Sequence, residues 1–193
     1  MGVPSIVGQS AEARFRDLYD KNYAAICGFA LRRVSNAEAA DVVAETFLVA
    51  WRRLEAIPVG SERLWLYAVA RRVVANQRRG LNRRMKLAAA LQFEFDATVV
   101  TDSAESDYPT IAGALKRLRE SDRQVLSLAA WEGLGPEELG KVLGCSPGAA
   151  KVRLHRARRR FREELEALES SDEAIVRGSG GRASTSAATS TED

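Results

Sequence analysis

Residues 135–160 read GPEELGKVLGCSPGAAKVRLHRARRR, and this stretch decides the fold. Pro136 suits the first turn of a helix, where its missing N–H costs no hydrogen bond, and Gly144 can end that helix in a left-handed conformation. Ser146 can cap a second helix that begins at Pro147. Two short helices joined by a glycine-containing turn are typical of a DNA-binding helix-turn-helix, although an ordinary helical hairpin with a basic surface has similar spacing.

The second helix of this stretch separates an apolar stripe from a cationic face. The stripe runs from Ala150 through Leu154 and Ala157 to Phe161, and we expect it to face the core. Outward side chains near the start of such a helix reach base edges, whereas later arginines are better placed for phosphates. The residues expected to contact duplex DNA are Ser146, Gly148, Lys151, Val152, Arg153, His155, Arg156, Arg158 and Arg159.

Helical periodicity dominates the rest of the chain and predicts an all-α fold of two small helical domains joined by a linker. Three amphipathic helices are expected within residues 11–87, and capping-box patterns begin at Ser35 and at Ser121. Ser61 is expected to cap the third helix. Residues 88–110 are expected to form the linker and residues 111–169 the helix-turn-helix domain. Residues 1–10 and 170–193 are expected to be disordered, the latter because Ser, Thr, Ala and Gly bury little apolar surface.

Charge follows these divisions. Residues 11–87 hold 15 Lys and Arg against 8 Asp and Glu, and residues 111–169 hold 12 against 9. Residues 88–110 hold five acids and no base. Basic domains indicate a polyanionic partner, although a solvated helical surface has a similar composition.

Composition excludes several classes of protein. No stretch approaches the roughly 18 apolar residues of a membrane span, and the first ten residues lack the pattern of a secretory signal, so we expect a cytoplasmic protein. Cys27, Cys145 and His155 are too few and too scattered for a zinc site, and we expect no metal and no cofactor. Glycine-rich phosphate loops and nucleophile motifs are also missing, so we expect no enzyme activity.

Three stretches of the sequence, one C-terminal and two N-terminal, together resemble one protein family. Residues 139–158, LGKVLGCSPGAAKVRLHRAR, resemble the helix-turn-helix of bacterial RNA polymerase sigma factors of the extracytoplasmic-function (ECF) group. Residues 41–51, DVVAETFLVAW, resemble the polymerase-binding helix of that family, and residues 65–71, WLYAVAR, resemble its promoter-melting helix. The resemblance covers about residues 11–168. The chain departs from the family pattern at Ala44, Arg72 and Asn76, where Gln, Asn and Asp are common, and this puts its promoter sequence in doubt.

The resemblance implies a mechanism and partners. Such a factor binds core RNA polymerase and directs it to promoter DNA. It captures unpaired bases near minus ten with its N-terminal domain and reads duplex near minus thirty-five with its C-terminal domain. The acidic linker would thread into a basic channel of the polymerase. An anti-sigma factor is expected by analogy alone. The implied polymerase-binding residues are Asp41, Glu45, Thr46, Phe47 and Trp51.

The third helix carries cations opposite its buried stripe and aromatic residues on its flanks. This combination suits single-stranded DNA, where stacking contributes roughly 1–3 kcal/mol per base. The loop from Pro58 to Glu62 is the expected wall of a pocket for an extruded base, although Trp65 and Tyr67 taken singly are more typical of a core. The residues expected to contact the single strand are Ser61, Trp65, Tyr67, Arg71, Arg72, Arg78 and Arg79.

Two other functions fit parts of the sequence. A stand-alone regulator would bind duplex DNA through residues 111–168 alone, but this reading leaves residues 41–51 and 65–79 without a role. A nucleic-acid enzyme would need a metal cluster or a nucleophile, and the sequence offers neither pattern. Association with core polymerase is therefore the observation that separates the sigma-factor hypothesis from both.

Overall fold

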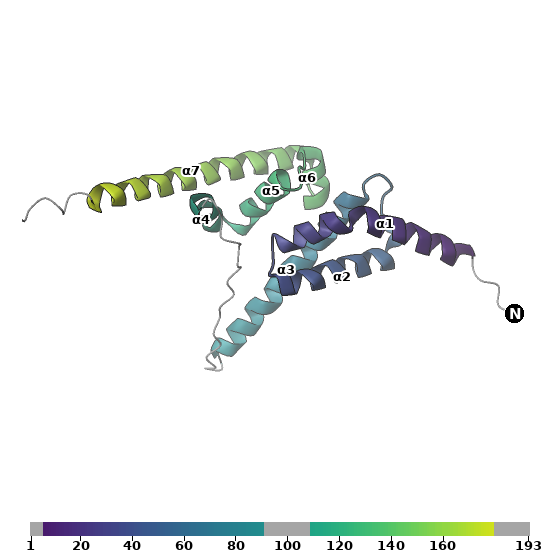
Figure 1. The fold of residues 1–193 in the computed structure, drawn as a ribbon. Coiled ribbons are helices and arrows are strands. Elements are labelled where there is room, and N and C mark those ends of the chain that lie inside the picture. The colour runs from purple at the N-terminus through teal and green to yellow at the C-terminus, as the bar shows by residue number, and fades with distance from the viewer. Residues whose placement is uncertain (1–5, 91–108, 180–193) are drawn as a thin grey trace, which may run out of the picture. The chain divides into compact units, whose positions relative to one another are not determined.

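A computed structural model describes residues 6–90 and 109–179 of the chain (Figure 1). Every regular element among these residues is a helix, so the prediction of an all-α fold is confirmed. No helix in the described part is long and apolar enough to cross a bilayer. The chain forms two compact units, one with residues 1–104 and 134–150 and the other with residues 105–133 and 151–193. The boundaries expected from sequence, at residues 88 and 111, stay a prediction.

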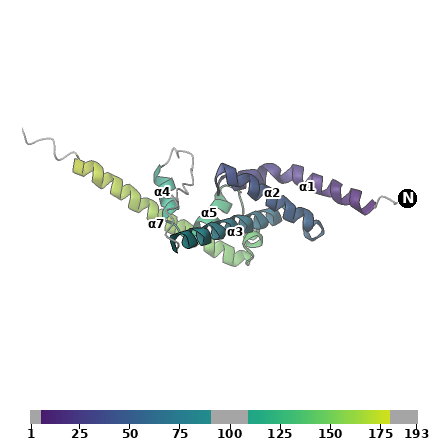
Figure 2. The same cartoon turned by 90° about the horizontal axis from the view of Figure 1, so that it is seen from below.

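Three long helices build the core of the first unit. They are α1 (Ile6–Leu31), α2 (Asn36–Arg52) and α3 (Glu62–Ala90), and the short 3-10 helix η1 (Leu54–Ala56) lies between the last two. Each of the three packs against the other two (Figure 2). Phe29 from α1 and Leu66 from α3 are fully buried between them. The three helices expected in this part of the chain are present, and α2 and α3 each bury an apolar face.

The chain enters α2 through a capping box. Ser35 Oγ accepts from the Glu38 backbone N–H at 3.4 Å, and the Glu38 carboxylate accepts from the Ser35 backbone N–H at 3.1 Å. This pairing satisfies two of the N–H groups that a helix start leaves without an intrahelical partner. The sequence pattern at Ser35 therefore predicted the helix start correctly.

The second unit contains α4 (Pro109–Arg117), α5 (Glu120–Ala130) and the part of α7 (Pro147–Ser179) that follows residue 150. Arg160 of α7 donates to the carboxylate of Asp122 on α5 at 2.6 Å, and only 11% of the Asp122 side chain is exposed. A short, largely desolvated and charge-assisted hydrogen bond is both strong and directional. This ion pair therefore holds α5 and α7 at a fixed rotation about their axes.

Three helix ends differ from the sequence predictions. Helix α1 begins at Ile6 and α7 continues to Ser179, so the predicted disorder is wrong for residues 6–10 and 170–179. An existing helix gains a hydrogen bond for each added residue, which lets it extend beyond its packed part. Helix α5 begins at Glu120 with Arg119 at its N-cap, so Ser121 lies inside the helix and its expected capping box is wrong.

Helix also reaches both edges of the predicted linker. Ala90 ends α3 and Pro109 begins α4, so three residues at one edge and two at the other are helical. The rest of the linker, residues 91–108, lies outside the described residues, as do residues 1–5 and 180–193.

Candidate nucleic-acid interface

The turn between α6 (Pro136–Leu143) and α7 has the local structure that its sequence predicts. Pro136 is the first residue of α6, and Gly144 ends that helix with a φ of +68°. Ser146 Oγ then accepts from the Ala149 backbone N–H at 3.2 Å and caps α7. Each of these features uses groups a few residues apart, which is why the sequence alone was sufficient to predict them.

Gly140 makes this turn possible in a way that sequence analysis missed. A Cβ built on Gly140 would lie 2.8 Å from the carbonyl oxygen of Cys145, and the Cys145 N–H donates to the Gly140 carbonyl at 2.9 Å. Because the close atom belongs to the backbone, no side chain can move aside to make room. The available signal was a glycine inside a predicted helix, four residues before the glycine that ends it.

The start of α7 presents its cationic face to solvent. Ala150, Leu154 and Ala157 are buried, Phe161 is half-buried, and 48% of Val152 is exposed. All the residues expected to contact duplex DNA are exposed: Ser146, Gly148, Lys151, Val152, Arg153, His155, Arg156, Arg158 and Arg159. Arg159 also pairs with the exposed Glu163 at 3.3 Å, an ion pair weak enough to yield to a phosphate. The geometry of the helix therefore leaves its predicted DNA-contacting residues available to a ligand.

The loop between η1 and α3 is anchored at its start and exposed at its tip. Ile57 is buried, whereas 87% of Val59 is exposed. Gly60 has a φ of +78°, and its N–H donates to the Glu62 carboxylate at 2.9 Å. Hydrogen bonds from the backbone N–H groups of Glu62 and Gly60 hold the pKa of the Glu62 carboxyl below its usual range, and the charges of Lys21 and Arg14 add to this effect.

The predicted single-strand residues on α3 and at its start differ in their exposure to solvent. Ser61, Trp65 and Arg71 are half-buried, while Arg72 and Arg79 are exposed. Burial lowers the pKa of Arg71, and the charge of neighbouring Arg72 lowers it further. These five residues stay candidates for contact with a single strand.

Two of the predicted single-strand residues make contacts within the three-helix unit. Tyr67 is 4% exposed, and its ring centroid lies 5.5 Å from that of Phe29. Arg78 donates to the carbonyl oxygen of Arg33 at 2.8 Å, just beyond the end of α1. We therefore correct the assignment of Tyr67, which is a core residue, whereas the half-buried Arg78 stays a candidate.

An open groove runs between α2 and α3. Asp41, Glu45 and Leu48 line it from α2, and Trp65 and Arg72 line it from α3. Ala44 and Asn76, two of the departures from the family pattern, also line the groove. Acidic, cationic and apolar side chains thus line the same groove, a combination that suits a protein segment with both kinds of charge.

The predicted polymerase-binding residues are only partly accessible. Asp41 and Glu45 are exposed, and so is 45% of Trp51. Thr46 is fully buried and donates to the Val42 carbonyl at 2.6 Å, and Phe47 is 4% exposed. The structure therefore corrects the assignment of Thr46 and Phe47, which can influence a partner only by shaping α2.

Phe47 and Trp51 belong to an aromatic cluster that links α2 to α1. Phe15 lies 5.1 Å from Trp51 between ring centroids, and Tyr19 lies 4.6 Å from Phe47 and 5.1 Å from Tyr23. Such tilted and edge-on pairs contribute about 0.5–1.5 kcal/mol each beyond the area that they bury. The sequence motifs alone did not predict this contact between the two helices.

Cofactor chemistry has no support in the described residues. No group of three or more His, Cys, Asp or Glu side chains there is arranged to hold a metal ion. Cys27 and Cys145 are both free and half-buried. The arrangement of exposed cations and half-buried aromatics can bind a nucleic acid.

Comparison with known proteins defines the class of this helical DNA-binding fold. The sequence model of Sigma-70 region 2 matches residues 18–84, and that of Sigma-70 region 4 matches residues 110–161. Helix α2 and most of α3 lie within the first match, and α5 and α6 lie within the second. The two matches together define a transcription initiation factor of the sigma-70 class.

Individual relatives narrow the class to one group. The ECF RNA polymerase sigma factor SigL of Mycobacterium tuberculosis is 34% identical over 161 residues, which cover 81% of this chain and 91% of SigL. The RNA polymerase sigma factor CarQ of Myxococcus xanthus is 31% identical over 82% of this chain and 93% of CarQ. The chain belongs to the ECF group of bacterial RNA polymerase sigma factors.

A solved structure agrees with this assignment. The sigma factor RpoE, in its co-crystal structure with the anti-sigma factor NepR from Bartonella quintana, matches with a TM-score of 0.61 and 26% identity. The match covers 79% of this chain and 96% of RpoE. The family resemblance seen in the sequence is therefore confirmed.

Proposed function

We propose that this sigma factor binds core RNA polymerase and recognises a promoter in two forms. The N-terminal unit holds unpaired bases near minus ten, and α7 reads duplex DNA near minus thirty-five. The observation that carries the proposal is the presence of two sets of exposed cationic side chains, one at the start of α7 and one along α3. Each surface has the chemistry that its form of DNA requires.

Duplex reading is supported by the exposed face of α7. Lys151 and Val152 occupy the first turns of the helix, where a recognition helix meets base edges. The arginines that follow lie along the same solvent-exposed side and suit phosphate contacts. Lys151 then selects guanine through its O6 or N7 acceptor, and Val152 selects thymine through its methyl group.

Single-strand capture is supported by α3 and the loop that precedes it. Arg71, Arg72 and Arg79 supply positive charge, and Trp65 supplies a half-buried aromatic surface. The exposed loop tip at Val59 and Gly60 stands where an extruded base can be received. Extrusion costs a few kcal/mol, so contacts with the base must offset that cost for the melted state to persist.

Polymerase binding is supported by the groove between α2 and α3. Asp41 and Glu45 carry exposed carboxylates there, and Leu48 adds an exposed apolar side chain.

The domains proposed for these tasks are residues 11–87 and 111–169, with residues 88–110 as the linker. An anti-sigma factor is a further proposed partner, because RpoE was solved in complex with the anti-sigma factor NepR. The proposed site of action is the cytoplasm, where RNA polymerase works.

The test is reconstitution of the full chain with bacterial core RNA polymerase. We expect the two to co-elute, and the transcripts made by the complex to begin at discrete positions that share two upstream elements. Specific duplex binding by the free chain, without any association with core polymerase, would instead support a stand-alone regulator. Asp41→Arg is the matched variant, since it reverses an exposed charge in the groove and should reduce co-elution while leaving the helical fold intact.

A further inference from the structure

The loop proposed to receive a base is fixed at its first residue by a distant helix. Arg14 of α1 donates from Nη2 to the carbonyl oxygen of Ile57 at 3.1 Å, across 43 residues of sequence. The Ile57 side chain is itself buried against the three-helix core. The start of the loop is therefore held both by packing and by a guanidinium from α1.

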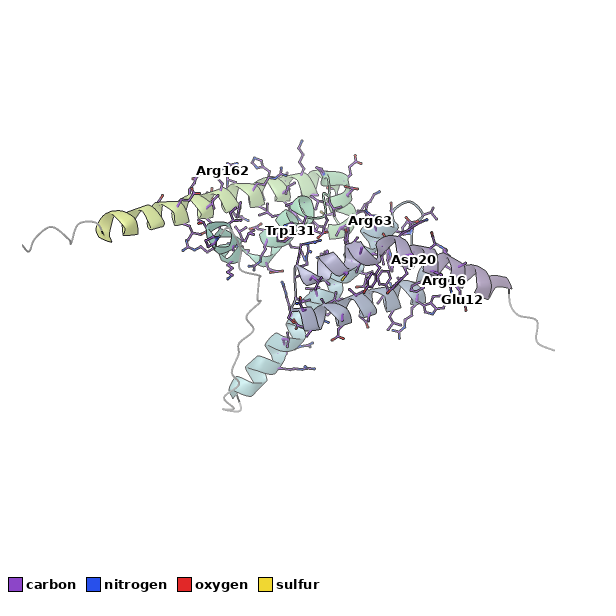
Figure 3. The ribbon with its side chains drawn as sticks, viewed as in Figure 1. Glu12, Arg16, Asp20, Arg63, Trp131 and Arg162 are labelled. Atoms are coloured by element: carbon purple, nitrogen blue, oxygen red, sulfur yellow. The ribbon has the colours of Figure 1, made fainter. Side chains whose placement is uncertain are left out.

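The end of the loop is tied to the same helix. Arg63 donates from Nε to the Asn22 side-chain oxygen at 3.4 Å, and Asn22 in turn donates to the Leu18 carbonyl at 2.8 Å. Asn22 is a buried polar residue, so its orientation is set by its own helix. Figure 3 shows Arg63 beside α1, with Arg16 further toward the N-terminal end of that helix.

Between these two points the loop has a free tip. Val59 is exposed, and Gly60 adopts a backbone conformation that other residues rarely take. The contact from Glu62 to the Gly60 N–H closes the loop on itself. A braced loop with an exposed tip has lost most of its conformational freedom before any ligand arrives, which reduces the entropy that binding must overcome.

We propose that Arg14 is a positioning residue for promoter opening: it holds the Ile57 carbonyl so that the tip at Val59 and Gly60 is set to receive the extruded base. This inference rests on the proposed capture of a single strand by the loop. Arg14 acts through the loop backbone and not through DNA. It therefore influences the opening step and the choice of base, while initial binding of duplex promoter does not depend on it.

The test uses holoenzyme made from core polymerase and the full chain, on a promoter located first by mapping transcript starts with the unmodified protein. Arg14→Met keeps an unbranched side chain that can pack as the arginine stem does, but removes the guanidinium with its charge and its donors. Arg14→Lys keeps the charge and one donor. Arg16→Ala is the matched control, because it removes the same charge two residues away. Opening is followed by the fluorescence of 2-aminopurine in the minus-ten element at saturating holoenzyme.

We expect Arg14→Met to slow opening about tenfold, since small displacements of a preorganised site are costly. The preference for the native base at the captured position should weaken, and Arg14→Lys should recover part of both properties. Core affinity, melting temperature and the salt dependence of duplex binding should match those of the unmodified protein and of Arg16→Ala. Arg63→Met, which removes the second brace, should show the same pattern to a smaller extent.

Two results would overturn the inference while leaving the proposed function in place. One is opening within twofold of the unmodified rate in both Arg14→Met and Arg63→Met. The other is a fall of about one in the salt slope for Arg14→Met, which would make Arg14 a phosphate contact. Failure of the unmodified protein to open any promoter with core polymerase would instead overturn the proposed function, and the inference with it.

Discussion

The turn between α6 and α7 and the loop between η1 and α3 both reverse the chain sharply, but they are stabilised differently. In the turn, Gly140 meets Cys145 and Ser146 caps Ala149, so all the groups lie within ten residues of one another. In the loop, the contacts from Arg14 to Ile57 and from Arg63 to Asn22 span 43 and 41 residues. The first is a local structure, and the second depends on the packing of a whole domain.

This difference predicts which mutations should impair each of the two proposed DNA-contacting surfaces. Changes far from the turn leave its hydrogen bonds in place as long as α6 and α7 remain helical. Changes in α1 reach the loop directly, although α1 carries none of the predicted DNA contacts. The two surfaces of one transcription factor are therefore expected to respond to different sets of mutations, and four experiments test this division.

The largest effect should come from Gly140→Ala in the turn. The new Cβ would press on the Cys145 carbonyl, and we expect a loss of about 1–3 kcal/mol in the free energy of unfolding, as for other overpacked sites. Gly80→Ala in α3 is the matched control because its Cβ meets nothing within 4 Å, and it should add about 0.5–1 kcal/mol through helix propensity. Chemical denaturation measures the free energy of unfolding of both variants. Equal effects of the two changes would show that the turn does not require a glycine at position 140.

A second test separates base reading from phosphate binding within α7. Lys151→Ala should reduce discrimination at one base pair of the upstream element by about 1–3 kcal/mol. Arg158→Ala should weaken binding to all sequences alike and lower the salt slope by about one. Binding of holoenzyme to a set of singly substituted promoters at several salt concentrations gives both values. Identical profiles for the two variants would contradict the assignment.

Ser146→Ala should have a smaller effect than Gly140→Ala, because it removes one capping bond without a clash. We expect a loss of about 1 kcal/mol, typical of an N-cap serine. Ser146→Asp is the informative companion, since aspartate also accepts from a helix N-terminus and should retain stability while repelling nearby phosphates. Thermal unfolding and promoter affinity should therefore diverge for Ser146→Asp, and a parallel loss of both would argue against this account.

The smallest effect should be a pH dependence in the loop. The pKa of Glu62 is lowered in the folded protein, so its ionised form contributes stability above its ordinary range, and this contribution disappears as the pH falls through the lowered value. Glu62 is too well solvated for a large effect. Glu62→Gln should flatten the pH dependence of the free energy of unfolding below the ordinary carboxyl pKa of 4.5, and should leave it unchanged between neutral and mildly acidic pH. An unchanged profile below that pKa would show that the contact with Gly60 does not govern the loop.

Local signals explain most of what the sequence predicted well. Pro136, Gly144, Ser146 and the pair at Ser35 and Glu38 each act within one helical turn, and all four features are present in the structure. Helical spacing likewise identified the buried faces. The start of α5 was missed because Arg119 takes the N-cap position without a side-chain cap, so a serine two residues later gave a misleading signal.

Predictions of individual site residues were less accurate where packing decides exposure. Thr46, Phe47 and Tyr67 are typical members of binding motifs by residue type, but the contact of α2 and α3 with α1 buries all three. Arg14 and Asn22 carry no motif of their own, and their roles appear only once Ile57 and Arg63 are brought beside them. A single sequence records no such pairing across forty residues.

The exposed face of α7 has a consequence for how this factor can diverge in evolution. Lys151, Val152 and His155 are exposed, and solvent-facing substitutions usually change stability by less than about 0.5 kcal/mol. The buried seam of Ala150, Leu154 and Ala157 lies on the opposite side of the same helix. If α7 reads duplex DNA as proposed, a duplicated gene can change the residues that meet the bases one codon at a time without unfolding the protein, so that paralogues acquire separate target sites on one scaffold.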